Sequence, residues 1–247
     1  MTDCTKNKHL GIAFCLLGRA EAVLLARGAG FDFCLVDMEH GPLGMDALGQ
    51  IAASGIAAGY PVWGRVSGPA SADLARVLDC GASGLIVPHV DSAEDARRIV
   101  RACRFAPLGK RSLPAPLPAL DYALLPAVKF CEDAGRNVII AAMIESAAGL
   151  EAAPEIAAVE GIDLLVIGTN DLADGLGLRG QPDHTDMRAA FHRVAQAAAH
   201  HGKDFGVMGL PPHLVKSHAP DATWIVATND TNLMIEGGAT AIGRFCN

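Results

Sequence analysis

The chain has 247 residues, of which 51% are hydrophobic and 5% aromatic, and its formal net charge at pH 7 is −7. This length supports one large α/β barrel or two smaller domains. The negative charge and the lack of a Lys/Arg cluster exclude nucleic acid and other polyanions as expected partners.

Short apolar runs alternate with Ala-rich helical stretches along the chain. The expected strands, in order, are "GIAFCLL", "FDFCLVD", "YPVWGRV", "SGLIVPHV", "NVIIAAMIES", "IDLLVIG", "KDFGVMG" and "TWIVAT". The expected helices lie near residues 20–27, 45–58, 70–80, 93–104 and 149–158, from 171, at 187–201 and 212–217, and from 231. The strands are continuous apolar runs, as is typical of parallel strands buried on both faces.

Eight such strand–helix units predict an α/β fold, a single (β/α)8 TIM barrel formed by residues 1–247. An open doubly wound sheet is the alternative, but the turn after the first strand, "LLGRAEA", lacks the expected glycine fingerprint. Two segments are longer than usual connections, the Pro-rich residues 105–136 and the polar residues 177–186. Long loops on a compact barrel are often functional. The "IEGGATAIGR" stretch near the C-terminus is interpreted as a loop and turn.

Seven cysteines occur, at positions 4, 15, 34, 80, 103, 131 and 246, and none forms a C-x-x-C pair. This odd number without close spacing argues against disulfides and cysteine zinc sites and favours a reducing cytoplasm. No hydrophobic run is long enough to span a bilayer, and the first residues lack the pattern of a signal peptide. We therefore predict a cytoplasmic protein with no membrane partner.

Polar side chains close four of the eight predicted strands. They are Asp37, Glu39 and His40 after the second strand, Arg65 after the third, Glu145 after the fifth and Asp171 after the sixth. Each alone is explained by helix capping, a surface ion pair or a solvated loop. The carboxyl ends of all barrel strands meet at one mouth, where the active sites of TIM barrels lie. Together, these residues therefore predict a site.

The residue types indicate a particular chemistry. Glu145 and Asp171 are hard oxygen donors that suit Mg²⁺ or Mn²⁺. Arg65 offers a planar fork for a carboxylate or enolate oxygen, and His40 carries an imidazole, the side chain most often used as a general base. The candidates to orient His40 are Asp37, Glu39 and Asp79. Metal, arginine and histidine together predict proton abstraction next to a carbonyl group, with the enolate held by the metal.

Several motifs together resemble a known family: "VDMEHGP", "GRV", "VLDCGASGLIVPHVDSAEDARR", "APLGKRS", "MIES" and "VEGIDLLVIGTNDL". They are similar to the metal-dependent class II pyruvate aldolases of the HpcH/HpaI family, over nearly the whole chain. The resemblance implies a TIM barrel in a homo-oligomer, a trimer or more typically a hexamer, with the C-terminal helix exchanged between subunits. It implies a divalent metal cofactor, Mg²⁺, Mn²⁺ or Co²⁺, and a small-molecule substrate built on pyruvate or another 2-oxo acid and an aldehyde.

The resemblance also implies a role for each strand-end residue. Glu145 and Asp171 match the metal ligands, and Arg65 matches the arginine that binds the pyruvate keto oxygen. His40 matches the catalytic base and Asp79 the acid that partners it, while Asp37 and Glu39 match carboxylates that surround the site. Gly168 and Asn170 match the loop whose N–H groups hold the pyruvate carboxylate, and Met208 matches an apolar residue that shapes the acceptor pocket.

The chain departs from the family pattern in a few places. The loop Gly168-Thr169-Asn170-Asp171-Leu172 replaces the common Gly-Pro-Ala-Asp-Leu, Met143 stands where Gln is common, and Ser112 where Gly is common. His89, after the fourth strand, is left open as a residue of the site or a packed or solvated histidine.

The predicted reaction is reversible retro-aldol cleavage of a 4-hydroxy-2-oxo acid to pyruvate and an aldehyde. No lysine ends a strand at the mouth, which argues against a Schiff-base mechanism. "MGLPP" and "VATND" are poor phosphate cradles, which argues against a phosphorylated substrate. Oxaloacetate decarboxylation and citramalyl- or malyl-CoA cleavage are the enzymatic alternatives. A non-enzymatic metabolite-binding barrel ranks last, because the residues expected to carry the chemistry are all present: Arg65, Glu145, Asp171 and His40.

Overall fold

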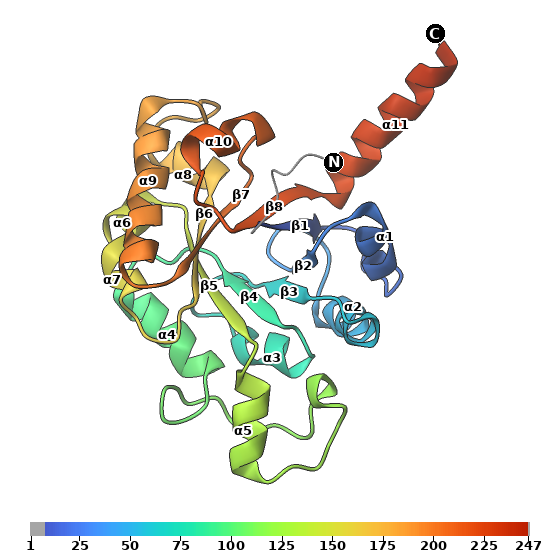
Figure 1. Cartoon of the computed structure of the whole chain (residues 1–247), viewed down its shortest axis with the longest axis vertical. Helices are drawn as coiled ribbons and strands as arrows, with labels where there is room; N and C mark the ends of the chain where they lie inside the picture. Colours follow the sequence, from blue (N-terminus) through green and yellow to red (C-terminus); the bar gives the residue numbers. More distant parts are fainter. Residues whose placement is uncertain (1–7, 247) are drawn as a thin grey trace.

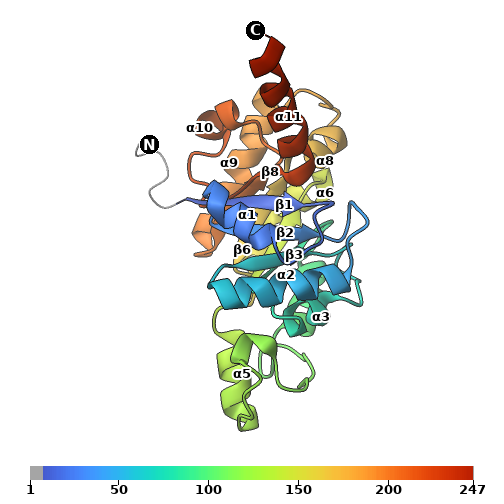
Figure 2. The same ribbon diagram turned by 90° about the vertical axis from the view of Figure 1, so that its right-hand side faces the viewer.

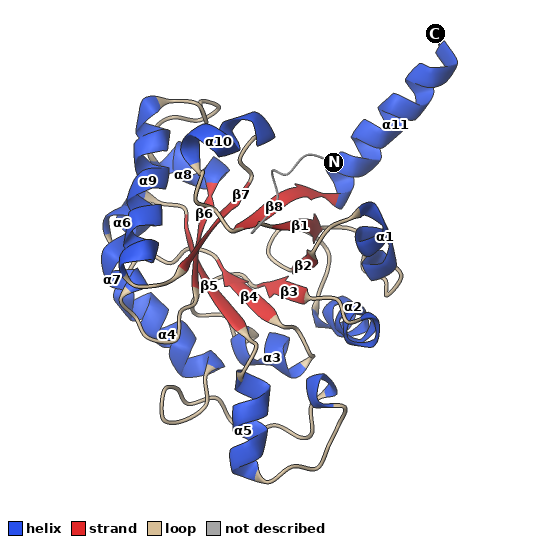
Figure 3. Cartoon of the chain, in the orientation of Figure 1, coloured by secondary structure: helices blue, strands red, loops and turns tan. Residues whose placement is uncertain are grey.

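The computed structural model describes residues 8–246 and contains a closed barrel of eight parallel strands (Figures 1 and 3). The strands are β1 His9–Phe14, β2 Phe33–Asp37, β3 Val62–Arg65, β4 Gly84–Val87, β5 Ile139–Ile144, β6 Leu164–Gly168, β7 Asp204–Met208 and β8 Trp224–Asn229. Each strand pairs with the next, and β8 pairs with β1 to close the barrel. The prediction of a TIM barrel is confirmed.

The helices lie outside the barrel, and most of them surround it (Figure 3). They are α1 Ala22–Ala29, α2 Met45–Ala58, α3 Leu74–Asp79, α4 Ala93–Cys103, α5 Ala127–Gly135, α6 Ala147–Glu151, α7 Ala153–Ala157, α8 Thr169–Gly175, α9 Thr185–His200, α10 Val215–His218 and α11 Asp230–Cys246, with 3-10 turns η1 Pro118–Leu120 and η2 Pro212–Leu214. The single helix expected near residues 149–158 is two short helices. Pro154, at the start of α7, has no N–H to continue the α6 ladder.

The sequence predicts a long loop over the Pro-rich segment 105–136, but the segment is partly helical. It contains η1 and the helix α5, which extend from one end of the molecule in Figure 1. The rings of Phe105 and Phe130 lie 6.1 Å apart, and both belong to a small apolar cluster of their own. A helix forms here because the apolar residues after Pro126 have a cluster to pack against.

Side chains of each strand alternate between the barrel interior and the surrounding helices. On β2, Phe33 and Leu35 belong to the inner cluster, and Cys34 and Val36 to the layer beneath the helices. Both faces are buried, which explains the continuous apolar runs. The same alternation directs Asp37, two residues after Leu35, into the mouth of the barrel.

The C-terminal helix α11 extends away from the barrel in both perpendicular views (Figures 1 and 2). It includes the "IEGGATAIGR" stretch, so the prediction of a loop and turn there is wrong. Asp230 holds the start of α11 in place, because its carboxylate accepts hydrogen bonds from the N–H groups of Cys15, Leu16 and Leu17 at 3.0, 2.9 and 2.7 Å. Beyond this anchor, the helix exposes the apolar side chains of Leu233, Met234, Ile235, Ile242 and Phe245.

Within the part of the chain that the structure describes, no helix combines the length and hydrophobicity needed to cross a membrane.

Candidate active site

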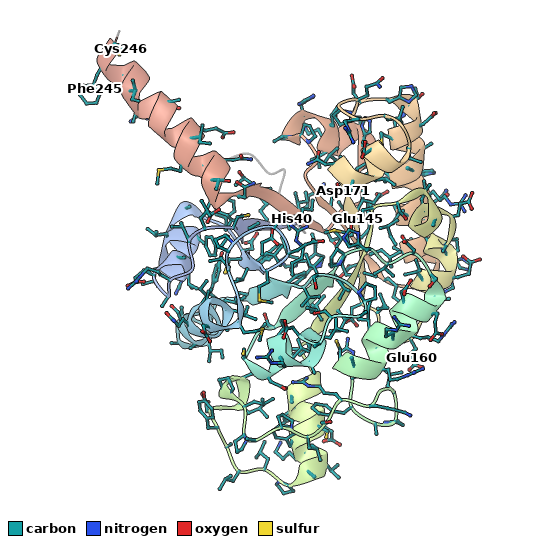
Figure 4. All side chains as sticks on the ribbon, turned by 180° about the vertical axis from the view of Figure 1, so that it is seen from behind. His40, Glu145, Glu160, Asp171, Phe245 and Cys246 are labelled. Atoms are coloured by element: carbon teal, nitrogen blue, oxygen red, sulfur yellow. The ribbon has the colours of Figure 1, made fainter. Side chains whose placement is uncertain are left out.

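A cavity of about 630 Å³ opens at the carboxyl ends of the strands. Its volume is typical of small-molecule sites. Eight of the residues singled out from the sequence line it: Asp37, His40, Arg65, Glu145, Gly168, Asn170, Asp171 and Met208. Figure 4 shows three of them, His40, Glu145 and Asp171, at the centre of the molecule, whereas Glu160 lies away from them. Tertiary structure therefore assembles most of the predicted set.

A second cavity, of about 660 Å³, lies outside the barrel between α4 and α5. It is lined by arginines, but Arg104 pairs with Asp163 and Arg111 with Asp79. Strand-end groups of the mouth do not belong to its lining. The mouth of the barrel is therefore the candidate active site.

Arg65 is buried between two carboxylates. It is the register partner of Asp37 on the neighbouring strand, and its Nε and one terminal nitrogen lie 3.0 and 2.5 Å from the two Asp37 oxygens. Its other terminal nitrogen lies 3.0 Å from Glu39 Oε2. The three side chains are 7%, 2% and 8% exposed, respectively, so these ion pairs are held away from water. This arrangement sets the plane of the guanidinium.

The pKa of Asp37 reflects two opposing effects. Burial alone raises it, but the hydrogen bonds and charge of Arg65, with the N–H groups of His40 and Glu39, bring it below its ordinary value. Those two N–H groups lie 3.1 and 3.0 Å from Asp37 Oδ1 and fix the turn after β2. Burial lowers the pKa of Arg65, and Asp37, Glu39 and Glu145 outweigh it, so the pKa is raised and the guanidinium stays charged.

Glu145 follows β5 and points into the barrel, two residues after the interior Met143. Its Oε1 accepts a hydrogen bond from the backbone N–H of His89 at 2.8 Å and lies 2.8 Å from the ring Nδ1 of the same residue. Burial raises the pKa of Glu145, the His89 contacts lower it, and the nearby charges of Glu39 and Asp171 raise it, with a net increase. A cation beside Glu145 would relieve this repulsion among carboxylates.

Gly168 ends β6 and lies against Glu145. A Cβ atom at Gly168 would stand 2.6 Å from Glu145 Oε2, so a larger residue would displace the carboxylate from its present position. The next residues begin the short helix α8, with Asn170 and Asp171 exposed in its first turn. The two predicted metal ligands therefore come from neighbouring strand ends.

His40 and Asp79 are not brought together within the chain. The His40 ring is 64% exposed at the mouth, with its Nε2 3.8 Å from Glu39 Oε2. Asp79 ends α3, pairs with Arg111 at 2.6 Å and lines a different cavity. Its predicted contact with His40 does not occur in this single chain.

Three further features at the mouth were not assigned from the sequence. His89, left open there, contacts both Glu39 and Glu145. Thr228 of β8 and Asn232 of α11 also line the cavity. Cys15 also lines the cavity. It lies two residues after the interior Ala13, so the alternation of strand side chains predicts that it faces the barrel interior. Burial, with Asp37 and Asp230 nearby, raises the pKa of the Cys15 thiol to about 11, which keeps it protonated and a poor nucleophile at neutral pH.

The sequence is similar to those of a protein family and of several aldolases. The family described as HpcH/HpaI aldolase/citrate lyase matches residues 12–228. The chain is 36% identical to the 4-hydroxy-4-methyl-2-oxoglutarate aldolase tasA of Hapsidospora irregularis, over 97% of this chain and 90% of that protein. It is 35% identical to a hydroxypyruvate/pyruvate aldolase of Pseudomonas aeruginosa, over 90% and 82% of the two chains.

The fold is also similar to that of a solved structure. The crystal structure of an HpcH/HpaI aldolase from Desulfitobacterium hafniense DCB-2 superposes with a TM-score of 0.89 at 25% identity, covering 97% of this chain and 93% of that one. Family model, relatives and barrel architecture all lead to the same assignment: this chain belongs to the HpcH/HpaI aldolase/citrate lyase family.

Proposed function

We propose that this chain is a metal-dependent class II aldolase that cleaves a 4-hydroxy-2-oxo acid to pyruvate and an aldehyde, and catalyses the reverse addition. The observation that carries this proposal is the assembly of Arg65, Glu145 and Asp171 around one cavity at the barrel mouth. The names of the relatives, aldolases for 2-oxo acids, support the reaction class.

Two carboxylates would hold the metal ion. Glu145 and Asp171 are hard oxygen donors, and the space that a Cβ at Gly168 would fill lies directly beside Glu145 Oε2. The donor set suits Mg²⁺, Mn²⁺ or Co²⁺, with substrate and water as further ligands. When bound, such an ion would polarise the 2-oxo group and stabilise negative charge on its oxygen.

Arg65 would stabilise the same oxygen from the protein side. Cleavage of the C3–C4 bond leaves its electron pair on pyruvate, as an enolate with negative charge on the former keto oxygen. A guanidinium fixed by Asp37 and Glu39 needs no reorganisation to meet that charge. Because both carboxylates already hold the side chain, it stays oriented when the substrate leaves.

His40 would take the proton from the 4-hydroxyl group as the bond breaks, the aldehyde would leave, and protonation of the enolate at C3 would give pyruvate. Its exposed ring at the mouth is open to substrate. The assignment of Asp79 as the acid that partners His40 stays a prediction. N–H groups at Gly168 and Asn170 would receive the substrate carboxylate, and Met208, on the β7 side of the cavity, would face the aldehyde.

The assembly and its location are further parts of this proposal. The apolar side chains along α11 face solvent in the single chain, and a second copy of this chain would cover them in a trimer or hexamer with exchanged C-terminal helices. The proposal keeps the prediction of a single domain over residues 1–247, of which the structure describes residues 8–246. The six cysteines of the described part are free thiols, which supports a cytoplasmic location.

The test uses chelator-stripped protein, with and without Mn²⁺, and a panel of 4-hydroxy-2-oxo acids, oxaloacetate, and citramalyl- and malyl-CoA. The release of pyruvate is measured for each compound except malyl-CoA, whose cleavage products are acetyl-CoA and glyoxylate. Metal-dependent pyruvate from hydroxy-oxo acids is expected. It should disappear in Glu145→Ala and persist in Glu160→Ala, whose side chain lies away from the mouth (Figure 4). If only oxaloacetate gives product, the protein is a decarboxylase. If only the thioesters give product, it is a CoA lyase. If no compound of the panel is cleaved, it is a binding protein.

A further inference from the structure

His89 is held in an unusual backbone conformation directly after β4. Its φ is 56°, in the left-handed region that non-glycine residues seldom adopt, although His, Asn and Asp enter it more readily than others. This conformation turns the backbone N–H and the ring toward the same neighbour. Both the N–H and the ring Nδ1 lie 2.8 Å from Glu145 Oε1.

The other side of the ring reaches the second carboxylate of the mouth. His89 Nε2 lies 2.9 Å from Glu39 Oε1, and Glu39 Oε2 lies 3.0 Å from Arg65. A continuous chain of polar contacts therefore connects Arg65 to Glu145 through Glu39 and His89. The His89 side chain is 55% exposed, whereas those of Glu39 and Glu145 are 8% and 3% exposed, so the ring covers two buried carboxylates.

The two carboxylate oxygens of Glu145 have different neighbours. Oε1 accepts the backbone N–H of His89 and lies 2.8 Å from its ring Nδ1, while Oε2 faces Gly168 at the end of β6, the strand that leads to Asp171. A carboxylate held at one oxygen presents the other in a defined direction. Such outer contacts orient metal ligands in many sites, and their loss typically weakens metal affinity about 10–100-fold.

We propose that His89 is a positioning residue: it fixes Glu145 so that Oε2 points toward Asp171 for the divalent ion, and it connects this carboxylate to the Glu39–Arg65 pair that serves the substrate oxygen. This inference rests on the proposed function of Glu145 and Asp171. Neither ring nitrogen binds the ion in this arrangement, because both face carboxylate oxygens.

Two variants separate the ring from the backbone. His89→Gly keeps the N–H and readily adopts positive φ, but removes the ring. His89→Asn also tolerates this backbone and retains one side-chain donor for Glu145, without the reach to connect both carboxylates. The matched control is His192→Asn, on the exposed side of α9.

Mn²⁺ affinity is measured on the chelator-stripped full chain from the electron paramagnetic resonance signal of free Mn²⁺. His89→Gly should bind Mn²⁺ about 10–100-fold more weakly. His89→Asn should recover part of the loss, and His192→Asn should match the parent. Excess Mn²⁺ should restore kcat in His89→Gly, because the metal ligands themselves are intact. Parental Mn²⁺ affinity in His89→Gly, or a kcat that excess Mn²⁺ does not restore, would overturn the proposal.

Glu145→Ala distinguishes a failure of the proposed metal site from a failure of the proposed role of His89. If Glu145→Ala loses Mn²⁺ binding and His89→Gly does not, the metal site stands and the role of His89 is refuted. If Glu145→Ala binds Mn²⁺ as the parent does, the metal site itself is misplaced, and the positioning role fails with it. Direct coordination would appear as strong nitrogen coupling to bound Mn²⁺ that disappears in His89→Gly, and it would also refute the positioning role.

Discussion

Asp37 and Arg65 are register partners at the ends of β2 and β3, and their side chains form a two-point ion pair inside the barrel mouth. Strand pairing thus sets the distance between the two backbones, and burial keeps water from competing. Glu39 adds a second carboxylate to the same guanidinium. The guanidinium of Arg65 is therefore oriented by the barrel itself.

Arg65→Lys should lower kcat/KM about 10²–10³-fold, the loss typical of one group that stabilises a developing oxyanion. Lysine keeps the charge but cannot make the two-point contact with Asp37 and present a second planar edge to substrate. Steady-state kinetics of pyruvate release measure the effect. Arg97→Lys, exposed on α4, is the control and should be neutral. A parental kcat/KM in Arg65→Lys would contradict the assigned role.

Arg65→Met should destabilise the fold by about 3–5 kcal/mol, because it leaves buried carboxylates without their cation. Urea unfolding of Arg65→Met and Arg65→Lys at pH 7 measures the difference. Arg65→Lys should lie between the parent and Arg65→Met, since the ammonium group still offsets the charge of Asp37. Equal stability of all three proteins would show that the ion pairs are not important for folding.

Asp37→Asn should flatten the dependence of stability on acid pH. The folded pKa of Asp37 lies below its unfolded value of about 3.9, so its contribution is complete above pH 4 and is lost as the pH falls through the folded pKa. The free energy of unfolding is measured in urea at pH 7, 5 and 3. The difference between the parent and Asp37→Asn should decrease between pH 5 and pH 3. Asp221→Asn, on an exposed turn, is the control. A constant difference at all three pH values would argue against the lowered pKa.

Gly168→Ala should weaken metal binding and activity about 10-fold or more, because its Cβ would stand 2.6 Å from Glu145 Oε2 and displace the carboxylate. Its φ of −83° is accessible to alanine, so the effect is one of space and not of backbone strain. Mn²⁺ titration and kinetics test this. The control is Gly175→Ala at the end of α8, where the nearest atom would be 3.7 Å from the new Cβ. Equal behaviour of the two variants would refute the close contact.

Asp79→Asn should lower the free energy of unfolding by about 1.5–3 kcal/mol, the range for a hydrogen bond to a charged group. Arg111 has a side chain only 2% exposed and would lose its carboxylate. Urea unfolding measures the loss, and the pH profile of kcat tests the separate prediction that Asp79 partners His40. A changed pH profile with unchanged stability would favour the catalytic role over the structural one.

Ile235→Glu should reduce the molecular mass in sedimentation without lowering the thermal stability of the barrel. Ile235 is 70% exposed on the projecting helix α11, so a charge there costs the single chain little. In an assembly with exchanged helices, it would be buried against a second copy. An unchanged mass would place the subunit contacts elsewhere.

The strand alternation that places Phe33 and Leu35 inside the barrel also predicts that Asp37 points into its mouth. Helix α5 was missed because five prolines between residues 107 and 126 dominate the pattern of that segment. Paired glycines favour a turn in the sequence pattern, yet they lie within α11, because glycine costs a helix only about 1 kcal/mol relative to alanine.

The barrel and the set of polar groups at its mouth can be predicted from the amino-acid sequence. Eight short apolar runs alternate with helical stretches, and the carboxyl ends of parallel barrel strands meet at one mouth. How these groups pair becomes evident only in the folded chain. Asp37 meets Arg65 through strand register, His89 reaches Glu145 through one left-handed backbone angle, and Asp79 meets Arg111 instead of His40. Such pairings depend on register and loop conformation, which result from packing of the whole chain and have no signature in a short stretch of sequence.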